Sequence, residues 1–447
     1  MTKIKEIYLN NFKSFKDCRV KLDDFNIIIA PNNAGKSNFI LALEFINLAI
    51  RKGFDRAINE FGGLETLKNY RNPNENITIG IKSEKNTLTV FSRRISRNKR
   101  RISHNKYDEH IINFKDISNE TTFVFNEKIE KIEINIEGKY RIENLEGFNG
   151  YDDKQIVEEV NKKRHKKFSI KISINQTINI EENIPKKSKN QIFEFLGLSK
   201  LREFFKRDLV IENKDISDLL GFSFPLITIG IGIFTYYFSA HKIKETSEHK
   251  SGNILNKSGT NLASVLEHIK NENPDIFEEI STSLIGIVEE IEGIDISKDI
   301  LGRPELVFQE RLSDNTKEIP IDIISDGTIN LISTLTALYE YIPKTLIAIE
   351  EPERHLHLRA ISYLIEEFRN VSSEKQIIIT TQSSEILNNL DLKKDNLIFL
   401  FRDYDGNTKS ITHKDIPRFK EKLRIYKNDI SLLLKKEGLG YLGDYLE

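Results

Sequence analysis

Apolar residues follow a strand–helix rhythm in the last third of the chain. Two short runs, "KTLIAIEE" (344–351) and "QIIITTQ" (376–382), predict buried strands. Residues 328–342 predict a helix, and so do residues 358–371, whose apolar face comprises Leu358, Ile361, Leu364, Ile365 and Phe368. Short apolar strands that alternate with helices are typical of a parallel α/β sheet.

The first half of the chain shows a different mixture of patterns. Two β-branched runs, "IKEIYL" (4–9) and "FNIIIA" (25–30), predict strands. Apolar residues over 39–52 predict a helix that directly follows the second run. Residues 76–180 predict short alternating strands, separated by basic runs.

Two further segments contain residues that interrupt a helix or form a turn. Residues 261–291 predict helices that are broken at Pro274. Residues 396–413 predict a hairpin that turns at Asp405-Gly406.

Composition limits the class of protein. The chain has 447 residues, 38% hydrophobic and 30% charged, with a formal net charge of −1, which is ordinary for a globular protein. Cys18 is the only cysteine, and the N-terminus has no apolar core of a signal peptide, so we expect a cytoplasmic protein without disulfides. Residues 219–240 are uncharged and long enough to span a bilayer, but Pro225 and three glycines favour buried strands and no membrane span.

The segment "APNNAGKSN" (30–38) has the chemistry of a phosphate-binding loop. It lies between a predicted strand and a predicted helix, so its N–H groups and the helix dipole favour a bound phosphate. Lys36 would bridge the β- and γ-phosphates, and the Ser37 hydroxyl would bind magnesium. Ala30 stands where such loops usually have their first glycine, and an alanine is tolerated there if its φ is negative. Asn33 can enter the left-handed region more readily than most other residues. The alternative is a chance G-K-S at a helix start.

The run "IAIEEPE" (347–353) ends a buried strand in two adjacent carboxylates. In a phosphate-loop enzyme Glu350 would hold magnesium and Glu351 would polarise the attacking water. A solvated strand end is the alternative. Lys36 and Glu350 lie 314 positions apart, so a large insertion would separate two halves of one ATPase core.

The run "SDGT" (325–328) opens a helix about 20 residues before the carboxylate strand. This helix start would offer a second set of N–H groups to an anion. One chain would need this second group of N–H donors if it contacts the ATP that another copy of the chain binds. The alternative is a simple N-cap by Ser325 or Asp326.

These motifs together resemble the ABC-type ATPases of the SMC, RecF and OLD group, especially the compact ATPases common in bacterial phage-defence operons. The resemblance covers residues 1–50 and about 300–447. It is carried by the opening "LNNFKSF" (9–15), the Walker A loop "PNNAGKSN" with Asn38, the signature "SDGT", the Walker B run "IAIEEPE", the D-loop "ERHLH" (353–357) and the switch segment "IIITTQSSEIL" (377–387).

The resemblance implies an α/β fold, a P-loop NTPase built as an ABC-type ATPase head with a mixed sheet, plus an inserted α+β region. The N-terminal half of the core would occupy residues 1–90, and a β-rich basic insertion residues 91–215. A helical connecting region would occupy residues 216–300, and the C-terminal half of the core residues 301–447. Residues 60–70 are the best candidate for the family's Q-loop.

The resemblance also implies that two chains sandwich two ATP molecules. Lys36, Glu351 and Gln382 would act in hydrolysis, while Ser37 and Glu350 would hold Mg²⁺. The residues against ATP would be Lys13, Asn33, Ala34, Gly35, Lys36, Ser37 and Asn38 of one chain, and Ser325 and Gly327 of the other. The family has glycine, aspartate and histidine at the positions of Ala30, Glu350 and Gln382, so these departures imply slow hydrolysis.

Basic residues and histidines suggest further contacts. A basic run at 93–106 includes Arg93, Arg94, Arg97, Lys99, Arg100 and Arg101, and a second run lies at 162–167. These cations could neutralise nucleic-acid phosphates, or they could protect hairpin edges from aggregation. His355 and His357 are too few for a zinc site, so we expect them to pack in the D-loop.

Two functions remain open from the sequence. The first is an ATP-gated homodimer or larger homo-oligomer that serves as sensor and scaffold in an anti-phage system, with a separate effector such as a nuclease. The second is a DNA-repair or chromosome-maintenance ATPase of the RecF or SMC type, which would bind duplex DNA. The signature and the long insertion disfavour the ATPase subunit of a membrane transporter.

Overall fold

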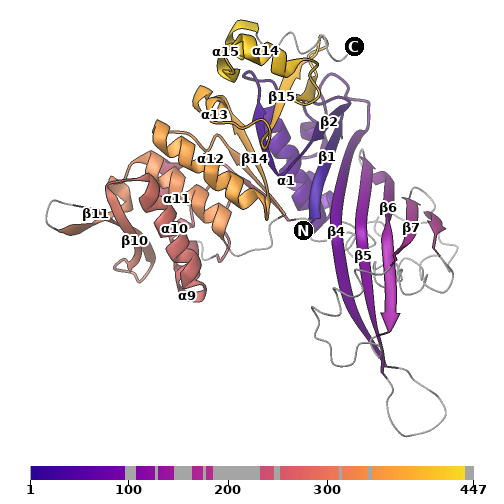
Figure 1. Ribbon diagram of the computed structural model, residues 1–447, viewed down its shortest axis with the longest axis horizontal. Coiled ribbons are helices and arrows are strands. Elements are labelled where there is room, and N and C mark those ends of the chain that lie inside the picture. The colour runs from indigo at the N-terminus through magenta and orange to yellow at the C-terminus, as the bar shows by residue number, and fades with distance from the viewer. Residues whose placement is uncertain are drawn as a thin grey trace. The chain divides into compact units, whose positions relative to one another are not determined.

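The computed structural model shows two compact units (Figure 1). Unit 1 comprises Met1–Asn11, Ala49–Lys68 and Asn72–Gly230, and unit 2 comprises Phe12–Leu48, Asn69–Arg71 and Ile231–Glu447. The structure describes residues 2–95, 107–125, 129–144, 164–174, 178–184, 232–245, 252–311, 315–340 and 345–437. The Walker A, signature, Walker B and switch segments all belong to unit 2.

Unit 2 is built on a six-stranded sheet. Its strands, in spatial order, are β16 (Thr408–Thr412), β15 (Asn396–Arg402), β3 (Phe25–Ile29), β14 (Gln376–Thr381), β13 (Leu346–Glu350) and β9 (Ile233–Tyr236). All neighbouring pairs are parallel except β15 and β16. The register pairs Ile29 with Thr381 and Glu350 with Thr380, so β3, β14 and β13 end at the same edge of the sheet.

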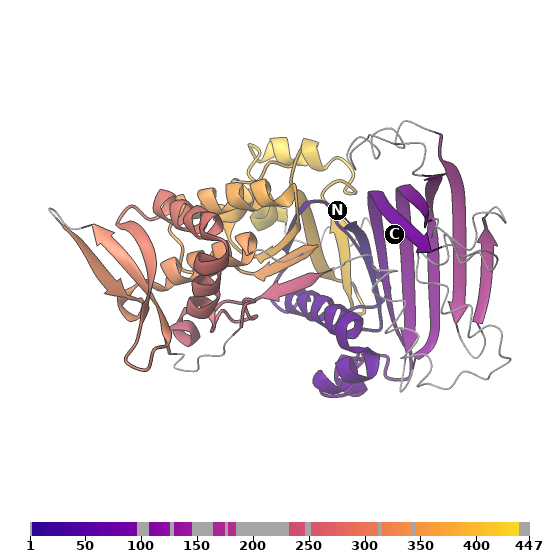
Figure 2. The ribbon, with the colours of Figure 1, turned by 90° about the horizontal axis from the view of Figure 1, so that it is seen from below.

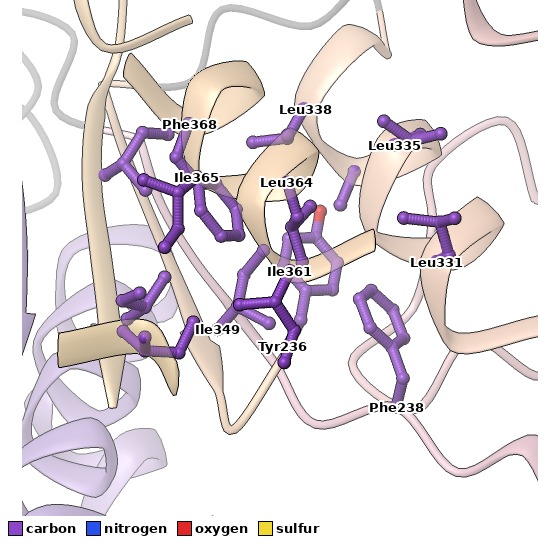
Figure 3. Packing of buried hydrophobic residues seen from close by; sticks show 14 of the residues in the cluster. Tyr236, Phe238, Leu331, Leu335, Leu338, Ile349, Ile361, Leu364, Ile365 and Phe368 are labelled. Carbon is purple, nitrogen blue, oxygen red and sulfur yellow. The ribbon is translucent and has the colours of Figure 1, made fainter. Parts of the chain in front are cut away.

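Both faces of this sheet are buried, which explains why its strands are continuous apolar runs. Helix α1 (Lys36–Lys52), in indigo, lies on one side, and α12 (Leu358–Ser372) and α14 (Phe419–Ile425) lie on the other (Figure 2). Figure 3 shows Ile349 of β13 near Ile361 and Phe368 of α12 in one buried cluster. Burial of one such side chain stabilises the fold by roughly 1.5–3 kcal/mol.

Helix α11 (Asp326–Tyr339) is buried on every side from Gly327 to Leu338. Its polar residues are accommodated because their hydroxyls bond carbonyls one turn earlier. Ser333 bonds the carbonyl of Ile329 at 2.7 Å, and Thr336 bonds that of Ile332 at 2.8 Å.

The described part of unit 2 contains further elements. It contains an antiparallel sheet of β10 (Ile291–Lys298), β11 (Pro304–Arg311) and β12 (Thr316–Pro320). The other elements are β2 (Cys18–Lys21), α8 (Ala240–Glu245), α9 (Leu262–Glu272), α10 (Pro274–Ile287), η2 (Ile321–Ile323), α13 (Ser384–Asn388) and α15 (Ile430–Glu437). Pro274 begins α10, so the predicted break is confirmed.

The described part of unit 1 contains antiparallel strands and two short helices. The strands, in spatial order, are β1 (Thr2–Asn10), β4 (Ile77–Ile95), β5 (Tyr107–Phe125), β6 (Ile129–Asn144), β7 (Lys166–Ile174) and β8 (Ile178–Asn183), and the helices are α2 (Phe54–Glu60) and α3 (Leu64–Leu67). The prediction of short strands was wrong here, because β4 and β5 have 19 residues each. Their ladder continues through the polar stretch of β4 that resembled a break.

The other predictions have mixed outcomes. The helix after the phosphate loop, the hairpin of β15 and β16 and the parallel sheet are confirmed. Leu358 does not join the buried face of α12, since it is 60% exposed at the first turn, beyond the core. Of the uncharged stretch, residues 232–240 include strand β9, and residues 219–231 lie outside the described part. Among the helices that the structure describes, none has the length and apolar character needed to cross a membrane.

Candidate functional site

The phosphate loop joins β3 to α1 and turns through two left-handed residues. Asn33 has φ 63° and Gly35 has φ 114°, which confirms the prediction that Asn33 can enter this region. Ala30 does not have a positive φ, so it needs no glycine. The loop therefore reaches the helix start without the usual first glycine.

Residues of the β15–β16 hairpin form hydrogen bonds to the backbone of this loop. Oγ1 of Thr408 lies 3.0 Å from the carbonyl oxygen of Ala34 and 2.7 Å from Oγ of Ser14. A Cβ on Gly35 would lie 2.7 Å from the same Thr408 oxygen, so only glycine fits. Arg402 donates to the carbonyl of Asn33 at 2.7 Å. The sequence did not predict these supports.

Lys36 begins α1 and is buried against its own loop. Its Nζ donates to the carbonyl of Ala30 at 2.7 Å. Burial lowers the pKa of the Lys36 ammonium, while the charges of Glu351 and Glu350 oppose that shift. The lysine therefore lies in the field of both predicted carboxylates.

Ser37 and Glu350 meet as the predicted magnesium site requires. The Ser37 hydroxyl donates to Oε2 of Glu350 at 3.1 Å. Partial burial raises the pKa of the Glu350 carboxyl, and the Ser37 bond opposes this. A hydroxyl and a carboxylate are hard oxygen ligands, which Mg²⁺ prefers, so this pair fits the ion. Asn38 of the same turn donates to Oγ of Ser14 at 2.9 Å.

Glu351 leaves the end of β13 in a left-handed conformation, with φ 45°. Its backbone N–H donates to the carbonyl of Thr380 at 2.9 Å. Gln382 donates to Oε1 of Glu351 at 2.9 Å, so the Walker B and switch residues are in contact. Arg354 donates from Nε to Oε2 at 2.7 Å. Arg354 was not predicted as a site residue, although its spacing of three residues from Glu351 is a signal for an ion pair.

The D-loop links the switch strand to the signature helix. Thr381 donates to Oε1 of Glu353 at 2.5 Å, and burial raises the pKa of that carboxyl. The carbonyl of His355 packs so closely on Gly327 that a Cβ there would lie 2.3 Å from it. Asn330 of α11 donates to the carbonyl of Arg354 at 3.3 Å.

The signature residues Ser325 and Gly327 lie at the start of α11, beside a cavity. Ser325 is the N-cap of α11 and accepts a hydrogen bond from the N–H of Thr328 at 3.2 Å. Ser325 and Gly327 line a cavity of about 480 Å³, together with D-loop residues such as His357. Within the described part of the chain, no hydrogen bond joins Ser325 or Gly327 directly to Lys36, Glu350 or Glu351.

The remaining predicted contact residues are only partly described. Lys13 is half-buried, with φ 50°, in the turn before the phosphate loop. Arg93 and Arg94 belong to β4, while Arg97, Lys99, Arg100 and Arg101 lie outside the described residues. Among the residues that the structure describes, no group of three or more His, Cys, Asp or Glu could hold a metal ion.

The parallel sheet, the phosphate loop and the paired carboxylates define an ATP-hydrolysing protein of the P-loop class. The chain belongs to the AAA ATPase domain family, whose model matches residues 2–387. It is therefore an ATPase, and the α/β fold with a mixed sheet predicted from the sequence is confirmed.

Several known proteins are similar to this chain. It is 49% identical over 47 residues to the chromosome partition protein Smc of Methanococcus voltae, a match that covers 10% of this chain and 4% of that protein. An SMC head bound to the C-winged helix domain of ScpA has a TM-score of 0.43 and 13% identity, over 92% of this chain and 98% of that one. The SMC head domain from Thermotoga maritima has a TM-score of 0.38 and 13% identity, over the same shares.

Proposed function

We propose that this chain binds ATP with Mg²⁺ at the ends of β3, β13 and β14 and hydrolyses it slowly as part of a sandwich of two chains. The observation that carries the proposal is the convergence of Lys36, Glu350, Glu351 and Gln382 at one sheet edge. These residues come from segments more than 300 positions apart in the chain. Ligands of α/β sheets bind outside the carboxyl ends of the strands.

Each residue has a separate task in this proposal. The loop from Asn33 to Asn38 binds the phosphates through its N–H groups, and Lys36 exchanges its bond to Ala30 for the β- and γ-phosphates. Ser37 and Glu350 hold Mg²⁺, which neutralises charge on the phosphate oxygens. Glu351 accepts the proton of the attacking water, and Gln382 donates to the γ-phosphate without carrying charge.

The second chain completes the site in this proposal. Ser325 and Gly327 offer the helix start of α11 to the ATP held by the other copy, and Lys13 approaches the nucleotide within its own chain. Support comes from the cavity beside Ser325 and Gly327, since Lys36 of the same chain is not among the described residues that line it. A site that needs two chains couples ATP occupancy to assembly.

The biological role follows from that coupling. We propose that the ATP-bound oligomer acts as sensor and scaffold in a bacterial anti-phage system, and that a separate toxic effector such as a nuclease carries the effector activity. Support comes from the motif resemblance to compact ATPases of such systems. The local likeness to Smc supports the alternative, a chromosome or repair ATPase that binds duplex DNA through cations such as Arg93 and Arg94.

Assembly can be tested by light scattering of Glu351→Gln, which should trap ATP. We expect ATP to convert it to a dimer or larger oligomer, and Lys36→Ala to abolish nucleotide binding. Ser325→Arg should bind nucleotide but fail to assemble, whereas Ser373→Arg, at the exposed end of α12, should assemble normally. Retained nucleotide binding by Lys36→Ala would reject the site, and normal assembly of Ser325→Arg would reject the sandwich.

Two measurements separate the proposed roles. The sensor role predicts that the chain copurifies with the product of a neighbouring effector gene and that ATP changes that complex. The chromosome role predicts duplex binding that depends on ATP and weakens when Arg93 and Arg94 are neutralised. Duplex binding without any effector partner would favour the second role.

A further inference from the structure

Arg354 connects the carboxylate of Glu351 to a tyrosine outside every predicted motif. Its Nε donates to Oε2 of Glu351 at 2.7 Å, and its Nη1 donates to the hydroxyl of Tyr237 at 2.7 Å. The guanidinium carbon also lies 5.2 Å from the centre of the Tyr237 ring. One planar guanidinium therefore holds two side chains through different nitrogen atoms.

The opposite oxygen of Glu351 is held as well. Gln382 donates to Oε1 at 2.9 Å, while the backbone N–H of Glu351 is bonded to Thr380. The orientation of the carboxylate is thus set by two side chains and a left-handed backbone. Each carboxylate oxygen keeps a second lone pair, which can accept a proton from water.

Tyr237 is itself fixed by elements other than the motifs. It directly follows β9, and its N–H donates to the carbonyl of Lys257 at 2.9 Å. Lys257 forms an ion pair with Glu44 of α1, and Glu44 accepts a hydrogen bond from Thr235 at 3.0 Å. The backbone of Tyr237 is therefore anchored, and its side chain, which is 38% exposed, accepts the hydrogen bond from Arg354.

We propose that Arg354 and Tyr237 are positioning residues for ATP hydrolysis, which hold Glu351 where it receives the proton of the attacking water. The inference rests on the proposed function of Glu351. In the step, the water oxygen forms a bond to the γ-phosphorus while the bond to the β–γ bridging oxygen breaks. The water proton passes to Glu351, and ADP leaves with the bridging oxygen. A misplacement of about 1 Å in such a step costs about 100-fold in rate.

A graded set of variants tests the pair through steady-state ATP hydrolysis of the full chain. We expect Arg354→Ala to lower kcat by about 10- to 100-fold and to change KM less than about twofold, because the hydrogen bonds of Arg354 do not involve the phosphate loop. Arg354→Lys should restore little of the lost kcat, because one ammonium group cannot bond Glu351 and Tyr237 through separate nitrogen atoms of a planar guanidinium. Tyr237→Phe should lower kcat by only about 3- to 10-fold, because the ring remains.

The double variant with Glu351→Gln gives the sharpest test. If Arg354 acts through Glu351, then Arg354→Ala should cause no further loss once Glu351 is glutamine. Arg311→Ala is the matched control, because Arg311 makes the same Nε-to-glutamate bond, with Glu292, in the separate β10–β12 sheet. The control should keep wild-type kcat.

Three results would overturn the inference. They are wild-type kcat in Arg354→Ala, wild-type kcat in Tyr237→Phe, or an equal loss from Arg354→Ala with and without Glu351. Tyr237→Phe keeps the test decisive if Arg354→Ala fails to fold. Undiminished turnover by Glu351→Gln would instead reject the proposed function of Glu351, and the inference with it.

Discussion

Replacing Gly327 with alanine tests the contact between the start of α11 and the D-loop. The new Cβ would lie 2.3 Å from the carbonyl oxygen of His355, which is a backbone atom and cannot swing aside. An ordinary contact of about 3.5 Å requires the D-loop to move by roughly 1 Å. Because Asn330 also bonds this loop at Arg354, the shift should reach the partner of Glu351.

Gly286 offers a matched comparison for the magnitude. It also lies in a helix, α10, but a Cβ there would meet nothing within 4 Å. Alanine raises helix propensity at both sites by about 1 kcal/mol, so this gain cancels in the comparison. What remains at Gly327 is overpacking, typically about 1–3 kcal/mol. Gly286→Ala should therefore be more stable than Gly327→Ala by about 1–3 kcal/mol.

Urea unfolding followed by circular dichroism measures the stability difference. Hydrogen exchange of peptides from residues 351–358 measures the loop, and we expect faster exchange only in Gly327→Ala. ATP turnover should fall in that variant while nucleotide binding at Lys36 is retained. Equal stability of the two variants, together with unchanged exchange, would refute the reasoning.

Three further predictions follow from buried polar groups. Burial lowers the pKa of His413, so its stabilising contribution is present above pH ~6.5 and is lost as the pH falls below that value. The His413 part of the unfolding free energy should drop by at most about 1.4 kcal/mol per pH unit, so the urea midpoints at pH 7.5 and 5.5 should differ less in His413→Gln than in the wild type. Arg369→Ala leaves Asp395, which is 0% exposed, without its ion-pair partner, and should cost about 3–5 kcal/mol in the same assay. Gly35→Ala should abolish binding of a fluorescent ATP analogue, because the Cβ collides with Thr408; unchanged affinity would contradict the assigned fit.

The sequence predicted those parts of the site that depend on local pattern. β3, β13 and β14 are apolar runs because both faces of the sheet are buried, and such runs are visible without a structure. The left-handed Asn33 followed from the conformational freedom of asparagine. Ser37 and Glu350 were expected to meet at one magnesium ion, and their side chains are in contact. The hydrogen bond from Gln382 to Glu351 was not predicted, because Gln382 was expected to donate to the γ-phosphate.

Long-range side-chain contacts had no signature in the sequence. Thr408 and Arg402 support the phosphate loop from a hairpin about 370 positions away, and nothing in their neighbours distinguishes them from ordinary strand residues. The length of β4 was missed because its polar middle continues the pairing with β5, and such pairing has no signature in the sequence. Leu358 matched the helical period but lies past the edge of the core, which periodicity alone does not reveal.

The position of β3 has a consequence for biosynthesis. This strand is the first of its sheet to be made, yet both of its sheet neighbours, β14 and β15, emerge more than 340 residues later. At about 5–20 residues per second, translation leaves its apolar side chains without their final partners for roughly 20–70 s. The β3 side of the phosphate loop therefore reaches its final surroundings only after β14 and β15 have been made, so bound nucleotide cannot assist the folding of this segment before then.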